Sequence, residues 1–409
     1  MKTVGNHFNK SKHQNGISKL GLLFQSWSIL IKRMFYSNDN PTQQSPHIRS
    51  FDNVPGRLKN FVIASIPCWL IGLWNLGYQT NAAMAETGLK AISGWRGDLI
   101  AVFGVGYNTT DLFACLFHGL LYFMPIFLLA LFIVSFWEVI FSSIRRRPLS
   151  EGLLVFAWLF ALVVPAGIEL VKVGMAVSFG YVIGSAVFGG YGRYIVNPIV
   201  LSLVYLFFAY PDLVFNSQNW IPLPEVDTLL PLNIAATGGI EAIKSVGYSW
   251  WDLFLGVQPG PIGSVSVLGC VLGAFYLVLT DSASWRVMVS AVLGLLVAVM
   301  IYNLTANESN PMAAISASWH LLLGSFAFAV VFFATDPVAS ASTVSGRWVF
   351  GFLVGLLTVI IRVSHPAFNE GVLFAVLLAS LFSPFIDFCF VELNIRRRKR
   401  RIKGVQNEQ

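Results

Sequence analysis

Charged residues are scarce in this chain of 409 residues. Asp, Glu, Lys and Arg together make up 11% of it, whereas 56% of its residues are hydrophobic and the mean hydropathy is +0.68. A soluble domain of this length could not cover its surface with so few charged side chains. The composition therefore excludes a soluble globular protein and indicates a polytopic membrane protein.

Cysteine motifs are also lacking. The four cysteines lie far apart, each in or beside an apolar run: Cys68, Cys115, Cys270 and Cys389. None belongs to a CxxC pair or has a histidine at ligand spacing, which argues against an iron–sulfur cluster, a zinc site or a disulfide framework in this chain. We therefore expect buried apolar thiols and no metal site.

Long apolar runs, by contrast, are plentiful. Ten windows are long enough, or nearly so, to cross a hydrocarbon layer of about 30 Å: 59–79, 116–140, 152–167, 169–190, 196–211, 264–281, 285–303, 318–335, 347–363 and 370–392. The sequence predicts an all-α polytopic membrane protein of about ten transmembrane helices. Prolines at or beside several windows, such as Pro165, Pro198 and Pro384, predict that some of these helices are broken.

Lys and Arg residues gather at alternate ends of these windows. The arginines at 145–147, then Arg193, Arg286, Arg347 and the run RRRKRR at 396–401 all fall on one side if the chain starts in the cytoplasm. Such a bias marks the cytoplasmic side of a membrane protein, so both termini are predicted to be cytoplasmic. The net charge of +7 is thus a topology signal, and we expect no nucleic-acid partner.

The windows divide the chain into three parts. Residues 59–392 form the predicted membrane domain, in which 212–262 is an external loop; residues 1–58 form a cytoplasmic N-terminal arm and residues 393–409 a basic cytoplasmic tail. The arm has no small-residue cleavage site and is not interpreted as a signal peptide. Apolar residues at helical spacing between 20 and 34 predict an interfacial helix; a helix docked on the protein's own cytoplasmic surface is the alternative.

Two stretches of the membrane domain echo each other. EGLLVFAWLFALVVP at 151–165 and EGVLFAVLLASLFSP at 370–384 share an initial Glu-Gly and a proline fourteen residues after the glutamate. In the predicted topology they run in opposite directions, which would suit an inverted repeat. The alternative is that glutamate favours a helix start and proline a helix end, so that each pattern arose separately.

Acidic residues in or near the apolar windows are costly to place there, so each is a candidate for an ion path. Glu138, in FWEVIF, and Asp387, in PFIDF, are the strongest candidates. Asp336 is a third, although it precedes Pro337 and could instead cap a turn.

Two polar stretches between the windows could serve a cofactor. In PLNIAATGGIE at 231–241, Thr237 is either a plain loop hydroxyl or an attachment point. In FGGYGRYIVNP at 188–198, Gly189 and Gly190 would admit a planar ring, Asn197 would bond its heteroaromatic edge, and Arg193 would hold an anion. A cytoplasmic hinge between two helices, with an arginine placed by topology, is the alternative for the second stretch.

The order of these motifs resembles a known family. SPHIRS, FWEVIF, EGLLV, FGGYGR, LFFAYP, PGPIGSVS, ASWR, WHLLLGSFAF, FFATDPVAS and IIRVSHPAFNEGVL occur between residues 45 and 373, followed by the basic tail. In this order they are similar to the B subunit of the sodium-translocating NADH:quinone reductases and to the related D subunit of the Rnf complex.

The resemblance implies a ten-span subunit of the bacterial inner membrane that works with sister subunits. It implies FMN bound covalently through a phosphoester to Thr237 on the external side, and riboflavin held among the helices near Gly189, Gly190, Arg193 and Asn197. Electrons would pass through these flavins to ubiquinone or menaquinone, coupled to the movement of Na+. The ion path itself is predicted from the acidic residues Glu138, Asp336 and Asp387 named above.

The chain also departs from the family pattern. Pro231 and Ile234 stand where the family has an Asp and a Ser or Thr before the flavinylated threonine, and Tyr194 stands where it has an Asn. These departures fall on cofactor-facing motifs, whereas the framework motifs remain. Two alternatives therefore stay open, a structural paralogue of the complex that lacks the full set of cofactors, and a channel or transporter for a small solute.

Overall fold

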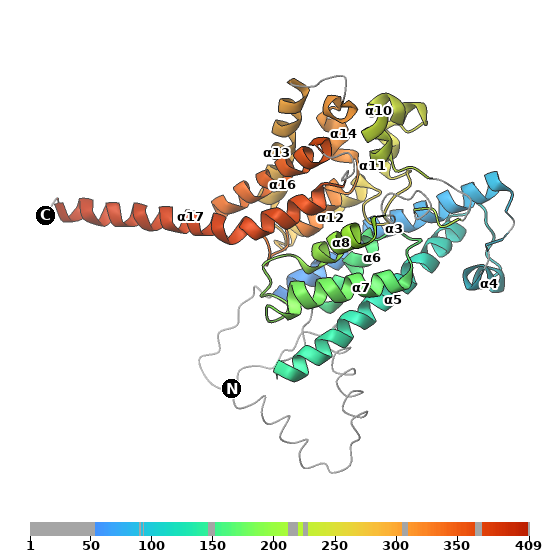
Figure 1. The fold of residues 1–409 in the computed structure, drawn as a ribbon, viewed down its shortest axis with the longest axis horizontal. Helices are drawn as coiled ribbons and strands as arrows, with labels where there is room; N and C mark the ends of the chain where they lie inside the picture. The colour runs from blue at the N-terminus through green and yellow to red at the C-terminus, as the bar shows by residue number, and fades with distance from the viewer. Residues whose placement is uncertain are drawn as a thin grey trace, which may run out of the picture.

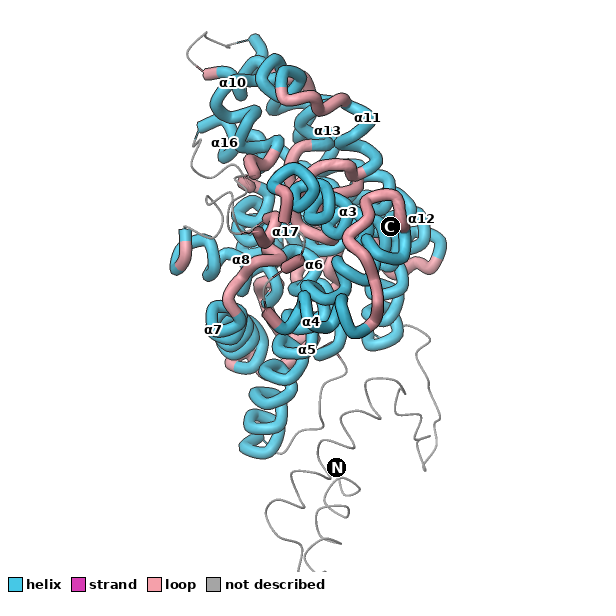
Figure 2. The backbone as a smooth tube through the Cα atoms, turned by 90° about the vertical axis from the view of Figure 1, so that its right-hand side faces the viewer, coloured by secondary structure: helices cyan, strands magenta, loops and turns pink. Residues whose placement is uncertain are grey.

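The structure is a computed structural model that describes residues 54–89, 91–92, 94–145, 152–211, 220–223, 228–304, 310–364 and 370–407. The predicted N-terminal arm and its interfacial helix lie outside these residues. Within them the regular elements are all helices and none is a strand, as Figure 2 shows. The predicted all-α class is confirmed.

The first half of the chain contributes five helical segments to the bundle. They are α3 (Val54–Thr87), α5 (Leu112–Arg145), α6 (Leu153–Val163), α7 (Leu170–Tyr181) with its π-helical continuation η2 (Val182–Ala186), and α8 (Pro198–Ala209). Each coincides with one predicted window.

The second half contributes five more, one of which is interrupted. They are α12 (Val267–Leu279), α13 (Trp285–Leu304), the segment formed by α14 (Ala317–Leu322), α15 (Phe326–Phe328) and the π-helix η5 (Ala329–Phe333), then α16 (Val344–Ser364) and α17 (Val372–Asn407). A short 3-10 helix, η4 (Pro311–Ala314), precedes α14.

Length and hydropathy support a polytopic membrane protein. Of the helices in the described ranges, five are long and apolar enough to cross a membrane: α3, α5, α13, α16 and α17. Four shorter apolar helices and the interrupted segment account for the other predicted windows. One segment is interrupted, between α14 and α15, but this break lies at residues 323–325 and not at Pro165, Pro198 or Pro384, the prolines from which broken helices were predicted.

The two stretches that begin with Glu-Gly, 151–165 and 370–384, each lie at the start of a helix, but the two helices differ in length. Helix α6 begins directly after Gly152 and α17 directly after Gly371. Pro165 lies beyond the end of α6, whereas Pro384 lies inside α17. The shared proline therefore ends only the first of these helices.

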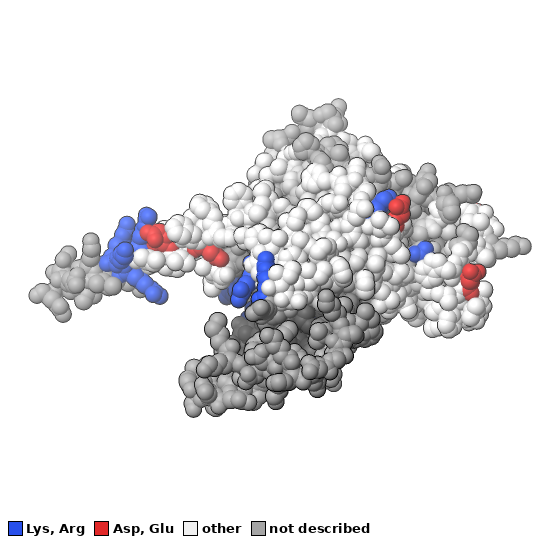
Figure 3. Space-filling view, turned by 60° about the horizontal axis from the view of Figure 1, so that its bottom comes forward, with Lys and Arg blue, Asp and Glu red and all other residues white. Residues whose placement is uncertain are grey.

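The two ends of the bundle differ in character. The helices α4 (Trp95–Val102), α10 (Pro231–Ser245) and α11 (Trp250–Leu255) lie at one end, and the C-terminal part of α17 projects from the opposite end (Figure 1). On the face drawn in Figure 3, charged side chains gather toward both ends and leave an uncharged zone between them. This distribution is the one expected of a protein whose middle lies in hydrocarbon.

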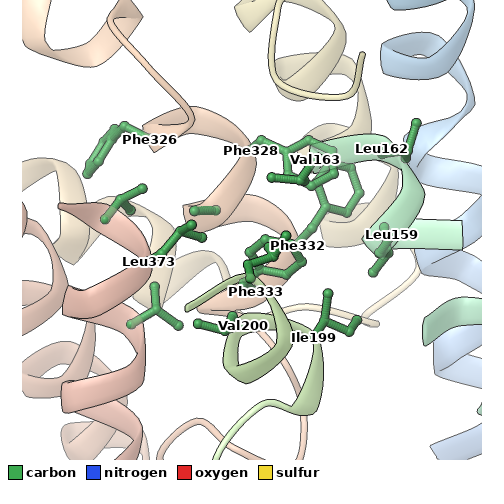
Figure 4. Packing of buried hydrophobic residues seen from close by; sticks show 14 of the residues in the cluster. Leu159, Leu162, Val163, Ile199, Val200, Phe326, Phe328, Phe332, Phe333 and Leu373 are labelled. Carbon is green, nitrogen blue, oxygen red and sulfur yellow. The ribbon is translucent and has the colours of Figure 1, made fainter. Parts of the chain in front are cut away.

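A buried aromatic cluster holds the centre of the bundle together. In Figure 4, phenylalanines of α15 and η5 meet aliphatic residues of α6, α8 and α17. The rings of Phe328 and Phe332 lie 4.6 Å apart, and both side chains are at most 1% exposed. Because η5 continues α15, the part of the interrupted segment after the break is held in the core by the packing of these phenylalanines.

Glycines let neighbouring helices approach to backbone contact. A Cβ atom added at Gly355 of α16 would overlap the carbonyl of Ala291 on α13, and one at Gly294 would overlap the carbonyl of Phe352. Small residues at helix contacts are the usual means of close packing in membranes, where van der Waals contact does much of the work. The α13–α16 contact therefore tolerates no side chain at these positions.

We predict that Gly355→Ala destabilises the protein by about 1–3 kcal/mol, because the backbones of α13 and α16 must separate to admit the methyl group. Gly56→Ala is the matched control, since a Cβ atom at this helical glycine meets nothing within 4 Å. Thermal unfolding in detergent measures both variants. Equal unfolding temperatures for them would contradict the packing described here.

Candidate functional site

The glycine-rich stretch 188–197 forms a tight loop between η2 and α8. Gly189, Gly190 and Gly192 have φ of 113°, 96° and 88°, a region that only glycine adopts easily. The loop turns Tyr194 and Asn197 inward, where they are 3% and 2% exposed, and leaves Arg193 exposed.

Asn197 and Asp336 come together although they lie 139 residues apart in the chain. The Asn197 Nδ2 atom donates to Asp336 Oδ2 at 2.8 Å, and the Tyr194 hydroxyl donates to the same carboxylate at 2.9 Å. The amide of Val338 donates to the other carboxylate oxygen at 2.8 Å. Asp336 is thus a buried, fully bonded carboxylate that ties the 188–197 loop to the turn after η5.

The hydrogen bonds of Asn197 limit what else it can hold. Its Oδ1 atom accepts from the amides of Ile199 and Val200 at 2.9 and 3.4 Å, which caps the start of α8. A flavin edge would therefore have to share Nδ2 with Asp336. Gly192 and the exposed Arg193 are easier to reach, because a Cβ atom at Gly192 would meet nothing within 4 Å.

The sequence points to Tyr194 as a departure within a cofactor-facing motif, where its ring could stack on a flavin. It does not predict the contact of the Tyr194 hydroxyl with Asp336, which only the fold shows. The interpretation of Asp336 as a turn cap is also partly right, since the carboxylate accepts from the amide two residues later.

Glu138 lies on a different pair of helices. It is fully buried on α5, and its carboxylate accepts a short hydrogen bond from the hydroxyl of Tyr181 at the end of α7. Two turns further along α5, Arg145 donates to the carbonyls of Ala186 and Val187 at 2.5 and 3.1 Å, where η2 ends. Both side chains therefore fix α7 and η2 to α5.

Asp387 of α17 caps the start of α16. Its carboxylate accepts from the amides of Ser342 and Thr343 at 2.7 and 2.9 Å and from the Thr343 hydroxyl at 2.6 Å. Asp336 and Asp387 thus hold the two ends of one connector, which joins η5 to α16.

Thr237 lies in a helix, so the expectation of an irregular loop or turn at this residue was wrong. It is part of α10, and its exposed hydroxyl donates to the carbonyls of Asn233 and Ile234 at 3.3 and 3.1 Å. Buried apolar residues before it, such as Leu232 and Ala235, give the helix a packed face. The helix is kinked two residues later, where Gly239 has φ 68°.

The second half of α10 borders an open groove. The groove has a volume of about 470 Å³ and is lined by Lys244, Gly247, Tyr248, Ser249, Trp250 and Trp319. Aromatic walls with one cation suit a planar, anionic ligand of the size of FMN. The residues present on this side therefore fit the cofactor that the motifs imply.

The side chains of Ser249 and Asp252, next to this groove, form hydrogen bonds with backbone amides. They form a capping box at the start of α11, in which the Asp252 carboxylate accepts from the Ser249 hydroxyl and amide. These hydrogen bonds hold the pKa of Asp252 below its ordinary value. Asp252 is thus a structural carboxylate.

The break between α14 and α15 holds two charged residues, Arg362 and Glu370. Glu370 is one of the acidic residues at window edges that the sequence makes candidates for an ion path, whereas Arg362 was not identified from the sequence. Arg362 of α16 is fully buried and donates to the carbonyls of His320 and Leu323, each at 2.8 Å. Glu370 accepts from the amide of Ser325 at 3.1 Å. The position of Arg362 inside an apolar window was the available signal for this residue.

Comparison with known proteins identifies the family. The NQR2, RnfD, RnfE family model matches residues 41–396. The chain is 37% identical over 380 residues to the B subunit of the Na(+)-translocating NADH-quinone reductase of Azotobacter vinelandii, a match that covers 92% of this chain and 94% of that protein. It is 37% identical over 390 residues to the corresponding protein of Chromohalobacter salexigens, covering 95% and 93% of the two chains.

A third relative agrees with these two. The same subunit of the Pseudomonas aeruginosa reductase is 36% identical over 400 residues, which cover 97% of this chain and 96% of that protein. These matches confirm the resemblance carried by the motifs, and the chain therefore belongs to the NQR2, RnfD, RnfE family.

Proposed function

We propose that this chain is the flavin-carrying membrane subunit of a bacterial sodium-translocating NADH:quinone reductase. It would work in the cell membrane with sister subunits and pass electrons through FMN and riboflavin to ubiquinone or menaquinone while Na+ crosses. The observation that carries the proposal is the exposed Thr237 hydroxyl on the helix that borders the aromatic groove. This helix lies at the end of the bundle opposite the basic tail (Figure 1).

Residues on that end have distinct parts in the proposal. Thr237 would carry FMN through its hydroxyl, and the kink at Gly239 gives the backbone room to turn beside a bulky group. Trp250 and Trp319 would stack on the ring system, and Lys244 would face its phosphate. When bound, FMN supplies one-electron and two-electron transfer, which no side chain of this site provides.

The cytoplasmic end would hold the second flavin and the entry of the ion. Arg193 and the glycines 189, 190 and 192 would receive riboflavin, with Asn197 at its edge. For Na+ to reach Asp336, the hydrogen bonds from Tyr194 and Asn197 to the carboxylate would have to open. Glu138 and Asp387 would extend the same path, each after release from its present partners.

One observation favours a second candidate, a paralogue that assembles with the complex but lacks flavin. Pro231 is the first residue of α10 and Ile234 is 7% exposed, so the positions that precede Thr237 serve helix formation and packing. The family has acidic and hydroxyl residues there. Riboflavin extracted from the purified complex at about one per chain would favour the flavin-carrying subunit, and its absence would favour the paralogue.

The first prediction concerns Thr237. When the chain is produced together with the flavin transferase of the same organism, its band on a denaturing gel should fluoresce under ultraviolet light. Thr237→Ala should abolish the fluorescence, whereas Ser245→Ala, which alters another exposed hydroxyl of α10, should keep it. A dark band for the native chain would contradict covalent FMN.

The second prediction concerns the ion path. Asp336→Asn and Asp387→Asn should each raise the Na+ concentration for half-maximal quinone reduction by roughly tenfold, about 1.4 kcal/mol of binding free energy. Asp98→Asn is the control, because Asp98 is exposed on α4 and lies outside all the predicted windows. An unchanged Na+ dependence in an assembled variant would remove that carboxylate from the path.

A further inference from the structure

The interrupted segment between α14 and α15 exposes backbone groups inside the bundle. Helix α14 ends at Leu322, and Gly324 follows with φ 65°, so the chain turns before α15 begins at Phe326. Hydrocarbon offers no hydrogen bonds to such groups, and each must find a partner in the protein. Arg362 donates hydrogen bonds to carbonyl groups before this turn, and the carboxylate of Glu370 accepts a hydrogen bond from a backbone amide after it.

Both charged groups converge on the same glycine. A Cβ atom added at Gly324 would lie 3.1 Å from Arg362 Nη2 and 3.1 Å from Glu370 Oε1. Arg362 uses its two terminal nitrogens on carbonyl oxygens. Glu370 uses only Oε2 for Ser325, and Oε1 has no hydrogen-bond partner among the residues described.

Glu370 lines a small cavity. The cavity has a volume of about 20 Å³ and lies between Gly324, the start of α10 at 230–232 and the stretch 258–265. Glu370 is 8% exposed, so it reaches the cavity from inside the protein. A cavity of this size holds one water molecule or one small ion.

Two further side-chain oxygens line the same cavity. Gln258 donates from Nε2 to the carbonyl of Val265, and neither its Oε1 atom nor the Ser264 hydroxyl has a hydrogen-bond partner in the described ranges. These residues are 6% and 4% exposed. Three buried residues that line a space for one particle thus each carry a side-chain oxygen without a hydrogen-bond partner in the described ranges.

We propose that this cavity is a binding site for a sodium ion near the external end of the path, with Glu370, Ser264 and Gln258 as ligands. The inference rests on the proposed function for the identity of the ion and deepens it. Carboxylate, hydroxyl and amide oxygens are the donors that hard cations prefer. Metals such as Zn²⁺ or Cu²⁺ would instead favour nitrogen or sulfur ligands, which these three residues do not offer.

Arg362 sets the strength of this site. Its positive charge lies near Glu370, so the carboxylate attracts a second cation less than an isolated carboxylate would. Weak binding suits an ion in transit, which must enter the site and also leave it. Arg362 thus has two roles. It bonds the backbone carbonyls at the interruption, and its charge weakens the binding of the ion so that the ion can leave.

The test uses the isolated multi-subunit complex and a titration of NADH:quinone reductase activity with Na+. Glu370→Gln keeps an acceptor for the amide of Ser325 but removes the charge. Ser264→Ala removes a hydroxyl that makes no hydrogen bond in the described ranges and keeps the bond from the Ser264 amide to the Pro261 carbonyl. We expect half-maximal activity at roughly tenfold higher Na+ for Glu370→Gln and at roughly threefold higher Na+ for Ser264→Ala. Glu241→Gln, a change of an exposed glutamate on α10, should leave the Na+ dependence of the native complex unchanged.

Native Na+ dependence in both cavity variants would overturn the site, and a water molecule would then fill the cavity. If the Glu370→Gln variant does not assemble, the Na+ titration of Ser264→Ala tests the site by itself. The Ser264 side chain makes no hydrogen bond to the backbone at the interruption between α14 and α15. A native complex whose activity ignores Na+ would overturn the proposed function and the site together. Normal stimulation by Na+ with no shift in the variants would overturn the site only.

Discussion

The whole structure depends on hydrogen bonds for backbone groups at the interruptions of its helices. A continuous helix satisfies its own backbone in hydrocarbon, but a broken one leaves amides and carbonyls without partners. Polar side chains from distant segments supply those partners. Arg362 bonds the carbonyls at the end of α14, Asp387 bonds the amides before α16, and Arg145 bonds the carbonyls after η2.

This use of charged side chains as backbone partners gives the candidate ion path a structural basis. Asp336 and Asp387 hold the two ends of the connector between η5 and α16, so any ion that displaces their partners loosens that connector. Coupling between electron transfer and ion movement needs an element with two arrangements that both processes bias. A connector held by two carboxylates can serve as such an element, because its hydrogen bonds can be exchanged for a cation.

Most of the helices could be predicted from the sequence, but the contacts of the candidate site could be predicted only in part. Apolar length predicted all ten helical windows, since hydrocarbon thickness sets that length directly. The helix around Thr237 was missed because Pro, Asn and Gly suggest a turn, whereas packing of Leu232 and Ala235 decides the outcome. The contact of Asn197 with Asp336 joins segments 139 residues apart, and no local pattern records it. The roles of Tyr194 and Arg362 could not be predicted for the same reason, because each depends on a contact with a residue distant in the sequence.

The central claim is that this chain belongs to a machine that drives Na+ across the membrane with electrons from NADH. The direct measurement is uptake of radioactive Na+ by inverted membrane vesicles that contain all subunits of the complex, started with NADH in the presence of a protonophore. The account predicts accumulation of Na+ that continues with the protonophore and disappears when this chain alone is omitted. Accumulation that persists without the chain, or that the protonophore abolishes, would contradict it.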